Sequence, residues 1–128
     1  LKALHDNNSV RYLYISVPLF SPTVFFEMVF PELMQRQLSA GHTHLYTESS
    51  LNWMADEFGM KKIAAWWFGS DMIDLYRNVV VQIGKQPETE KMTQVWSDMF
   101  SPIIDALQLE MDKKHLSSEV HMLFKFES

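Results

Sequence analysis

Two histidines, His42 and His44, flank a single threonine and are the side chains of this sequence best suited to proton transfer. In an extended segment residues i and i+2 point to the same side, so the two imidazoles would face one ligand. An unperturbed imidazole titrates near neutral pH, which makes either histidine a candidate general base or substrate ligand. A structural role, with the rings hydrogen-bonded to backbone where the next helix begins, is the second possibility. A metal site is the third, although no Asp, Glu or further His follows at a ligand spacing and cysteine is absent.

Further candidates for ligand contact lie where the first predicted strand ends. Ligands of wound α/β sheets bind outside the carboxyl ends of the strands. In this chain Pro18, Leu19 and Phe20 hold that position, and Tyr46 ends the segment that carries the histidines. We therefore expect these four residues to contact a substrate. Three phenylalanines of the next helix would line a substrate lid or else fill the core: Phe25, Phe26 and Phe30.

The composition excludes several classes of protein. The chain has 128 residues, enough for one domain, and 47% of them are hydrophobic, so a sizeable core can form. The formal net charge is -5 and no basic patch with interleaved aromatic residues occurs, so we expect no nucleic-acid partner. The absence of cysteine excludes disulfides and thiolate catalysis and fits a reducing cytoplasm. No apolar stretch reaches the roughly 18–20 residues that span a bilayer, so no membrane partner is expected.

The first residues show neither a signal peptide nor an initiator methionine. Leu1 to Asp6 begins as if within a helix, and no charged and apolar regions of a signal sequence precede a cleavage site. We therefore expect a chain that is truncated at its N-terminus or taken from a longer gene. No linker or low-complexity tract divides it, which predicts a single domain over residues 1–128.

Three segments have the composition of β-strands, at about residues 10–17, 60–68 and 119–126. The first is β-branched, aromatic and almost continuously apolar, which is typical of a strand that is covered on both faces. The second contains Trp66 and Trp67, which point to opposite faces, so one packs under a helix and the other needs a cover. The third alternates apolar residues with others.

About five helices are predicted around these strands. Ser21-Pro22 begins one helix, because a capping hydroxyl precedes a proline at the first helical position. Thr47 caps the next helix and Gly59 ends it. Pro87 is expected to begin a helix that runs to about Met99, and Ser101-Pro102 to begin another. A helix is also expected to end near Asn8, and one is expected to resume between Pro31 and Leu38.

Residues 70 to 83 fit two different elements. The run Val79-Val80-Val81 has the propensity of a strand. Apolar residues nevertheless recur at helical spacing, at Met72, Leu75, Tyr76, Val79, Val80 and Ile83. Ser70 and Gly84 provide the two ends, and Asp71 and Asp74 are interpreted as charges of the first turn rather than a carboxylate dyad. Because a six-residue match rarely arises by chance, we predict a helix.

This order of elements predicts an α/β fold with strands that need partners. The first two strands are joined through a helix, so they should run parallel, and the last strand can insert between them or lie at an edge. The first strand would then leave an apolar edge unpaired, which favours aggregation unless something covers it. Either further strands precede it or a second copy covers it, so we expect a homodimer or oligomer through this edge or through the helices.

Several segments resemble one enzyme family. Tyr14–Ser21, Gly41–Leu51 and Phe58-Gly59 resemble the C-terminal half of class I S-adenosylmethionine-dependent methyltransferases. They are most similar to the subgroup that carries a His-Thr-His-Leu-Tyr/Phe-Thr segment before the helix that follows the fifth strand. Leu107 to Asp112 and the closing strand are also similar to that subgroup. The resemblance covers nearly the whole chain but only half of the family's fold.

The resemblance implies a partial Rossmann-like methyltransferase fold with a three-stranded mixed sheet, in which residues 119–126 run antiparallel between the other two strands. The N-terminal half, which holds S-adenosylmethionine, has no counterpart here, because no two of the four glycines have a nucleotide-cradling spacing. We therefore expect no cofactor on this chain alone, and an inactive fragment.

The intact enzyme would methylate a small-molecule or sugar-like acceptor. The resemblance makes His42 and His44 the catalytic candidates, with acceptor contacts from five residues: Pro18, Leu19, Phe20, Phe26 and Tyr46. A non-catalytic interaction or dimerisation module of α/β fold is the alternative. Of the other histidines, His121 is expected to be structural and His115 to be solvated near a helix end.

Overall fold

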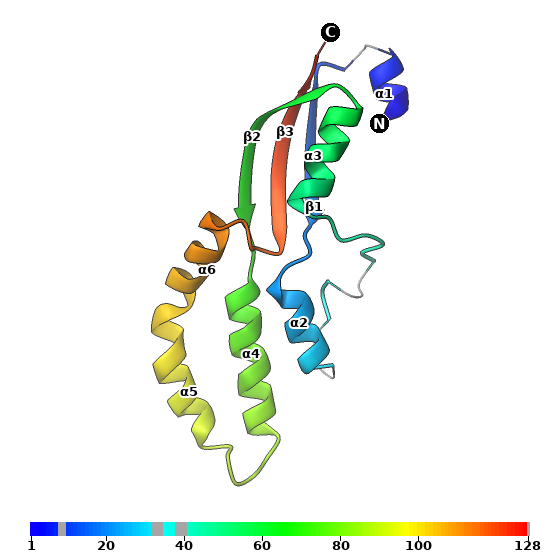
Figure 1. Cartoon of the computed structure of the whole chain (residues 1–128). Helices are drawn as coiled ribbons and strands as arrows, with labels where there is room; N and C mark the ends of the chain where they lie inside the picture. The colour runs from blue at the N-terminus through cyan, green and yellow to red at the C-terminus, as the bar shows by residue number, and fades with distance from the viewer. Residues whose placement is uncertain (8–9, 32–34, 38–40, 128) are drawn as a thin grey trace.

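The computed structural model describes residues 1–7, 10–31, 35–37 and 41–127, and within them three strands are separated by helices (Figure 1). In chain order they are α1 (Lys2–Asn7), β1 (Tyr12–Pro18), α2 (Pro22–Val29), α3 (Glu48–Glu57), β2 (Met60–Phe68), α4 (Asp71–Gly84), α5 (Met92–Phe100), the 3₁₀ turn η1 (Ser101–Ile103), α6 (Ile104–Lys113) and β3 (Glu119–Phe126). The three predicted strands are confirmed, with the first shifted by two residues at its start. No helix of the described part is long and apolar enough to cross a bilayer.

The three strands form one open sheet in the order β1-β3-β2. β3 pairs antiparallel with both neighbours, with Ile15 and Ala65 each opposite Met122. β1 and β2 therefore run in the same direction, as predicted, and the last strand takes the inserted position rather than an edge. The prediction of a mixed sheet is wrong, because β3 separates the two co-directional strands and every strand pair is antiparallel.

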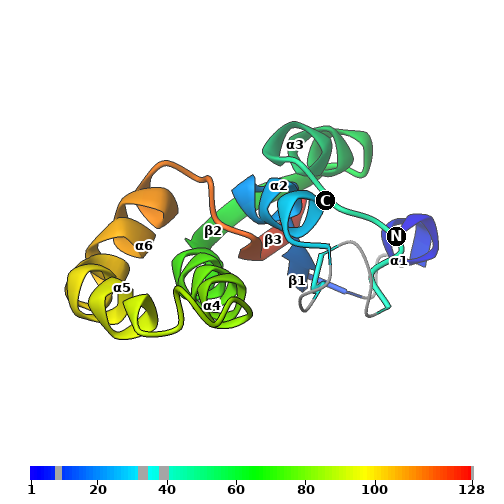
Figure 2. The ribbon, with the colours of Figure 1, turned by 90° about the horizontal axis from the view of Figure 1, so that it is seen from below.

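The core lies on one face of this sheet, under α3. Val120, Met122 and Phe124 alternate along β3 and are all 0% exposed. Leu51 and Ala55 are the buried residues of α3 and complete the cluster with Leu19 and Met60 from the ends of the neighbouring strands. Figure 2 shows α3 over one side of the strands. The central strand β3 supplies three of the seven residues of this buried cluster, more than any other element.

The ends of α3 confirm the predicted capping signals. The side chain of Thr47 accepts a hydrogen bond from Ser50 N, and the hydroxyl of Ser50 accepts one from Thr47 N, which is a capping box. Gly59 follows the helix with φ of 58°, a left-handed conformation that glycine adopts without a steric cost. The chain can therefore turn at once from α3 into β2.

The long helix α4 confirms the prediction from periodicity over that from propensity. The apolar stripe of α4 packs against α5 and α6, and this packing stabilises the helix. The strand propensity of three valines is too weak to outweigh it. Figure 1 shows α4, α5 and α6 extending below the ends of β1 and β2. The chain therefore has a second helical layer beyond the sheet rather than over it.

The predicted helix start at Pro87 is wrong. Residues 87–91 form turns, and α5 begins at Met92, because the hydroxyl of Thr89 donates to Ile83 O and so bonds to the end of α4. The predicted start at Ser101-Pro102 is confirmed in place, since η1 begins at Ser101 and leads into α6, although no side-chain capping bond forms there. The predicted resumption of a helix between Pro31 and Leu38 falls largely outside the described residues.

In the described part of the chain no helix lies over the second face of the sheet (Figure 2), and this face carries aromatic side chains. Tyr14 OH lies 2.7 Å from Nδ1 of His121, and the Trp66 ring centroid lies 5.1 Å from that of His121. Tyr14 and Trp66 are 53% and 46% exposed. The prediction that the two tryptophans face opposite sides is confirmed, since Trp67 packs against the core.

Replacement of Phe124 tests the position of the core. We expect Phe124→Ala to lower the free energy of unfolding by about 3–5 kcal/mol, because a fully buried ring on the central strand leaves a cavity. Urea denaturation measures this loss. Phe25→Ala is the matched control: its ring is 54% exposed, so the loss should stay within about 1 kcal/mol. Equal losses in both variants would contradict the placement.

Candidate functional site

The predicted contact residues meet where β1 ends. Tyr46 N donates to Pro18 O at 3.0 Å, and Phe20 N donates to Tyr46 O at 2.8 Å. These bonds form a parallel bridge between Leu19 and Tyr46. The structure therefore brings Pro18, Leu19, Phe20 and Tyr46 together, although they are separated by more than twenty residues of sequence.

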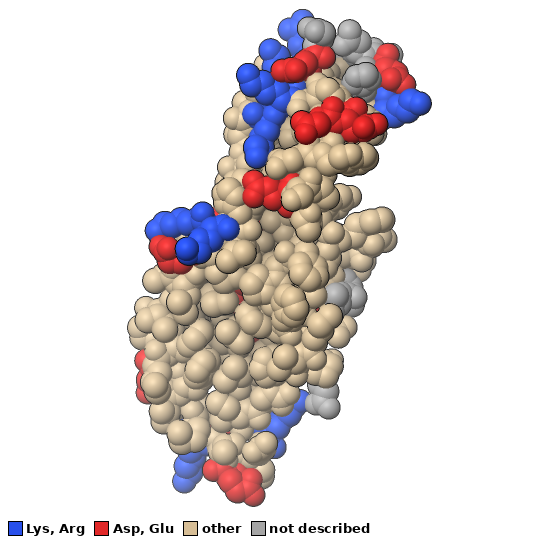
Figure 3. Space-filling view, viewed as in Figure 1, with Lys and Arg blue, Asp and Glu red and all other residues tan. Residues whose placement is uncertain are grey.

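Two aromatic pairs stand on this junction. The rings of Phe20 and Phe25 meet edge to face with centroids 5.7 Å apart, and both side chains are more than half exposed. The His44 ring lies 6.4 Å from that of Tyr46. Phe26, also predicted here, is only partly buried on α2 and belongs to neither pair. Figure 3 shows almost no charged side chain over α2, and Phe20 and Phe25 are exposed there, so Phe20, Phe25, His44 and Tyr46 form a largely apolar ridge beside the end of β1.

The two candidate catalytic histidines are both exposed. His44 Nδ1 lies 2.9 Å from the hydroxyl of Thr43, its sequence neighbour. Among the described residues, neither ring has a hydrogen bond to backbone, and no group of three His, Cys, Asp or Glu side chains is placed to hold a metal ion. Their role as a general base or substrate ligand thus stays a prediction.

Directly behind this ridge lies a buried carboxylate, that of Asp71, which is 0% exposed. Its Oδ1 accepts hydrogen bonds from Ser21 Oγ at 3.1 Å and from Thr23 Oγ1. Its Oδ2 accepts from Ser118 N at 3.1 Å, from Ser118 Oγ at 3.2 Å and from Gln108 Nε2 at 3.2 Å. This single side chain therefore joins the starts of α2, α4 and β3 to α6.

Asp71 lies in the first turn of α4, as predicted, and the network adds a role as a buried hydrogen-bond acceptor that the sequence did not predict. Gly69 lies so close to it that an added Cβ would overlap Oδ2 of Asp71 and lie 2.7 Å from Ser118 Oγ. The network continues through Gln108 Nε2, which also donates to Asp112 Oδ1 at 2.8 Å. The hydroxyl residues near the starts of α2 and β3 were visible in the sequence as possible hydrogen-bond donors. No local pattern, however, connects them with an aspartate about fifty residues away.

Asp74, one turn along α4, lies in a different environment. Its Oδ2 is 3.0 Å from Nη2 of Arg36, an ion pair without hydrogen-bond geometry. Burial raises the pKa of the Asp74 carboxyl, and the nearby guanidinium groups of Arg36 and Arg77 oppose this rise. Arg36 also lies 4.0 Å from Glu119, and its backbone N donates to Glu27 at 2.7 Å. Arg36 thus connects the segment after α2 with α4 and β3.

His115 is exposed near the end of α6, as predicted, but its ring also makes contacts that the sequence did not predict. It ends α6 with φ of 57°, and its ring stacks on Trp67 with centroids 3.3 Å apart and planes 6° apart. Its Nδ1 lies 3.0 Å from Oε2 of Glu48, and Lys62 Nζ lies 3.8 Å from the other oxygen. The contact fixes the end of α6 against β2 and the start of α3.

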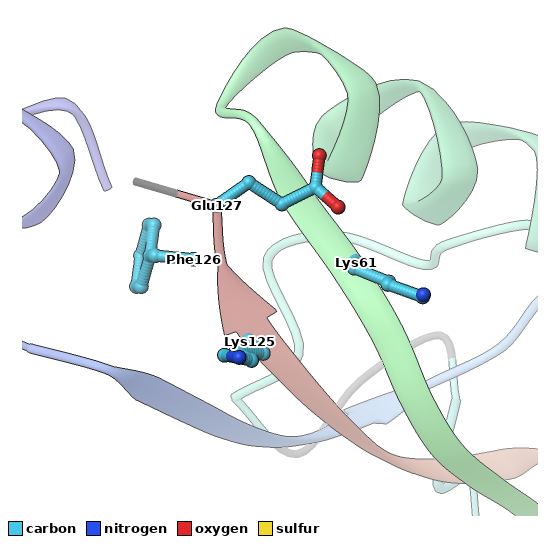
Figure 4. Close-up of a pocket in the computed structure, with 4 residues that line it drawn as sticks. All are labelled: Lys61, Lys125, Phe126 and Glu127. Atoms are coloured by element: carbon cyan, nitrogen blue, oxygen red, sulfur yellow. The ribbon is translucent and has the colours of Figure 1, made fainter.

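Two hollows among the described residues lie at the opposite end of the sheet. One of about 390 Å³ is lined by Lys61, Lys125, Phe126 and Glu127. Figure 4 shows these side chains pointing in different directions rather than toward a common centre. The lysines are directly opposite each other on adjacent strands, an unfavourable pair of like charges. This hollow therefore does not enlarge the candidate site.

Comparisons of the chain with protein-family models, with curated proteins and with solved structures find no match. The function is therefore inferred from the residues of the chain and their geometry.

Replacement of Asp71 tests the importance of the buried network. We expect Asp71→Asn to lower the free energy of unfolding by about 2–4 kcal/mol, because an amide nitrogen would face hydrogen-bond donors. Denaturation in urea measures the loss. The matched control is Asp105→Asn, an exposed aspartate in the first turn of α6, which should change stability by less than about 0.5 kcal/mol. A change as small in Asp71→Asn would contradict the role given to the carboxylate.

The raised pKa of Asp74 predicts a specific pH dependence. Between its usual and its raised pKa the folded protein binds more protons at this carboxyl than the unfolded chain does. The free energy of unfolding therefore falls as pH rises through that window and recovers as pH is lowered. Asp74→Asn should remove this component, which urea titrations at a series of pH values above about 3.9 would measure. An unchanged slope in the variant would contradict the assignment.

Proposed function

We propose that this chain is the acceptor-side part of an S-adenosylmethionine-dependent methyltransferase. The observation that carries the proposal is the sheet order β1-β3-β2 with β3 antiparallel to both neighbours. The resemblance implies this arrangement for the family's last three strands, whereas the order of elements alone also allowed the last strand to lie at an edge. The His-Thr-His-Leu segment that carries the resemblance leads into the bridge beside the end of β1.

The acceptor would lie on the ridge formed by Phe20, Phe25, His44 and Tyr46. Methyl transfer depends mainly on holding the acceptor atom in line with the methyl group. The aromatic rings offer flat apolar surfaces for a sugar-like or other small acceptor, and an exposed imidazole of His42 or His44 would accept the proton of its hydroxyl. The buried Asp71 network fixes the position of the end of β1 and the start of α2.

The residues of this chain do not fit the cofactor itself. Gly41 and Gly59 have positive φ, but Gly59 ends α3 and no helix begins directly after Gly41. Gly69 precedes α4, but the space beside it is filled by the side chains of Asp71 and Ser118. No glycine thus leaves backbone N–H groups open to a nucleotide at a helix start, and no step of the reaction is assigned here to the cofactor.

A second candidate function is a non-catalytic interaction module. The exposed aromatic residues on the open face of the sheet favour it, since Tyr12, Tyr14 and Trp66 are each about half exposed. Such a face is typical of a surface that binds protein. The two functions differ in whether a cofactor-binding segment belongs to the same protein.

The coding sequence upstream of the codon for Leu1 tests the proposal. We expect it to encode a strand, an acidic-Gly-x-Gly turn and a helix; a methionine start a few residues upstream would contradict the proposal. In the longer protein, His42→Ala or His44→Ala should lower methyl transfer to a panel of monosaccharides and small hydroxylated acceptors by about 10²–10⁴-fold, since a general base is lost. Tritiated S-adenosylmethionine measures this transfer.

Two controls separate function from folding. The melting temperature of both variants should match that of the parent, and His115→Ala should leave transfer unchanged because His115 stacks on Trp67 instead. Calorimetric titration of the 128-residue chain with S-adenosylmethionine should show no binding. Micromolar binding would place the cofactor site within this chain and overturn the division proposed here.

A further inference from the structure

The two edges of the sheet are protected to different degrees. The outer edge of β2 carries Lys61 and Lys62, and a register shift interrupts it between Lys62 and Ala64. Charged residues and bulges of this kind discourage pairing with another strand. β1, with the sequence Tyr-Leu-Tyr-Ile-Ser-Val-Pro, has no charged residue and no bulge, and its only proline is its last residue.

The backbone of β1 directs three residues toward its outer edge. Phe126 N donates to Arg11 O and Leu19 N donates to Ser118 O, so odd-numbered residues of β1 bond to β3. Because antiparallel bonds alternate, the N–H and C=O groups of Tyr12, Tyr14 and Ser16 face away from β3. Within the part of the chain that the structure describes, these groups have no hydrogen-bond partner.

The other end of the same edge is already paired. By the same alternation the carbonyl of Pro18 faces away from β3, and it accepts a hydrogen bond from Tyr46 N at 3.0 Å. The segment that ends in Tyr46 therefore occupies the edge from Pro18 to Phe20 and limits the free stretch to Tyr12–Val17. A stretch of this length is enough for one short strand.

We propose that a second copy of this chain occupies this edge, with the two β1 strands antiparallel about a two-fold axis at Tyr14. Tyr14 then faces its own copy, and Tyr12 of each chain faces Ser16 of the other. Each such pair exchanges two backbone bonds, which gives about six new hydrogen bonds. The result is a continuous sheet of two chains. This inference concerns the 128-residue chain by itself, because a strand encoded upstream of Leu1, as the proposed function expects, would compete for the same edge of β1.

The side chains of β1 are self-complementary in this register. Under α3 Leu13 of one copy faces Ile15 of the other, both partly buried and apolar. On the open face the two Tyr14 rings become neighbours, and each is already held by His121. No charged residue lies between Tyr12 and Pro18, so the net charge of the chain creates no repulsion within the pairing itself. Aromatic and apolar cross-strand pairs of this kind stabilise antiparallel strands.

Sedimentation equilibrium of the 128-residue chain tests the proposal, with a dimer as the expected result. Ser16→Pro removes an outward N–H without removing a bond to β3, and the symmetry doubles the loss. The dissociation constant of the dimer should rise about ten- to a hundredfold. Lys62→Pro is the matched control: Glu127 N donates to Gly59 O, so by the same alternation the N–H of Lys62 faces outward from β2. This variant should remain dimeric.

A second pair of variants tests the same register through charge. Tyr14→Lys places two ammonium groups opposite each other at the axis and should also dissociate the dimer. Trp66→Lys, on the same face and also against His121, should not. If a variant fails to fold, hydrogen exchange of the unsubstituted chain decides: the amides of Tyr14 and Ser16 should be protected more at higher protein concentration. A monomeric chain, or a dimer that tolerates Ser16→Pro and Tyr14→Lys, would overturn the proposal.

Discussion

The carboxylate of Asp71 is the interaction on which the arrangement of this molecule depends. It accepts hydrogen bonds from the first residues of α2, from the start of β3 and from α6, while it belongs to the first turn of α4. A fully buried carboxylate is costly unless donors surround it. Here the donors come from α6 and from the starts of α2 and β3, so the polar network joins helices that contribute no residue to the core cluster under α3.

This network also explains why the candidate site lies where it does. Leu19 is buried and its bridge to Tyr46 follows directly from the position of Ser21, which the carboxylate fixes. The rings of Phe20 and Phe25 therefore rest on buried residues on one side and face solvent on the other. A surface of this shape can orient a ligand but cannot enclose one, so further protein must cover it before water is excluded from any reaction there.

Much of the fold could be predicted from the sequence because its signals are local. Strand composition, the capping residues Thr47 and Gly59, and the helical stripe of α4 each depend on neighbours within one or two turns. The order of elements allowed β3 either to insert between the other two strands or to lie at an edge, and it did not decide between them. The contact residues at the end of β1 were predicted by the general rule for α/β sheets, which requires only that the strand end be recognised.

The wrong helix start and the contacts that the sequence did not predict all involve residues that are distant in sequence or belong to different elements. Pro87 predicted the start of α5 too early, because Thr89 bonds to a carbonyl of the preceding helix and the first helical turn forms only after it. His115 stacks on a tryptophan of another strand, and Asp71 contacts residues about fifty positions away on both sides. An aspartate in the first turn of a helix is ordinarily a charge near the helix dipole, and only tertiary structure distinguishes that role from a buried acceptor.

The position of β3 affects how the protein can be made. It is the central strand, and it follows every other described element in the chain, so β1 and β2 leave the ribosome before the strand that joins them exists. Ser118, a donor to Asp71, emerges equally late. Until then β1 and β2 lack the strand that pairs with both, and the Asp71 carboxylate lacks its two hydrogen bonds from Ser118. Contacts of such long sequence separation form slowly, so synthesis passes through a stage at which the nascent chain is most exposed to aggregation.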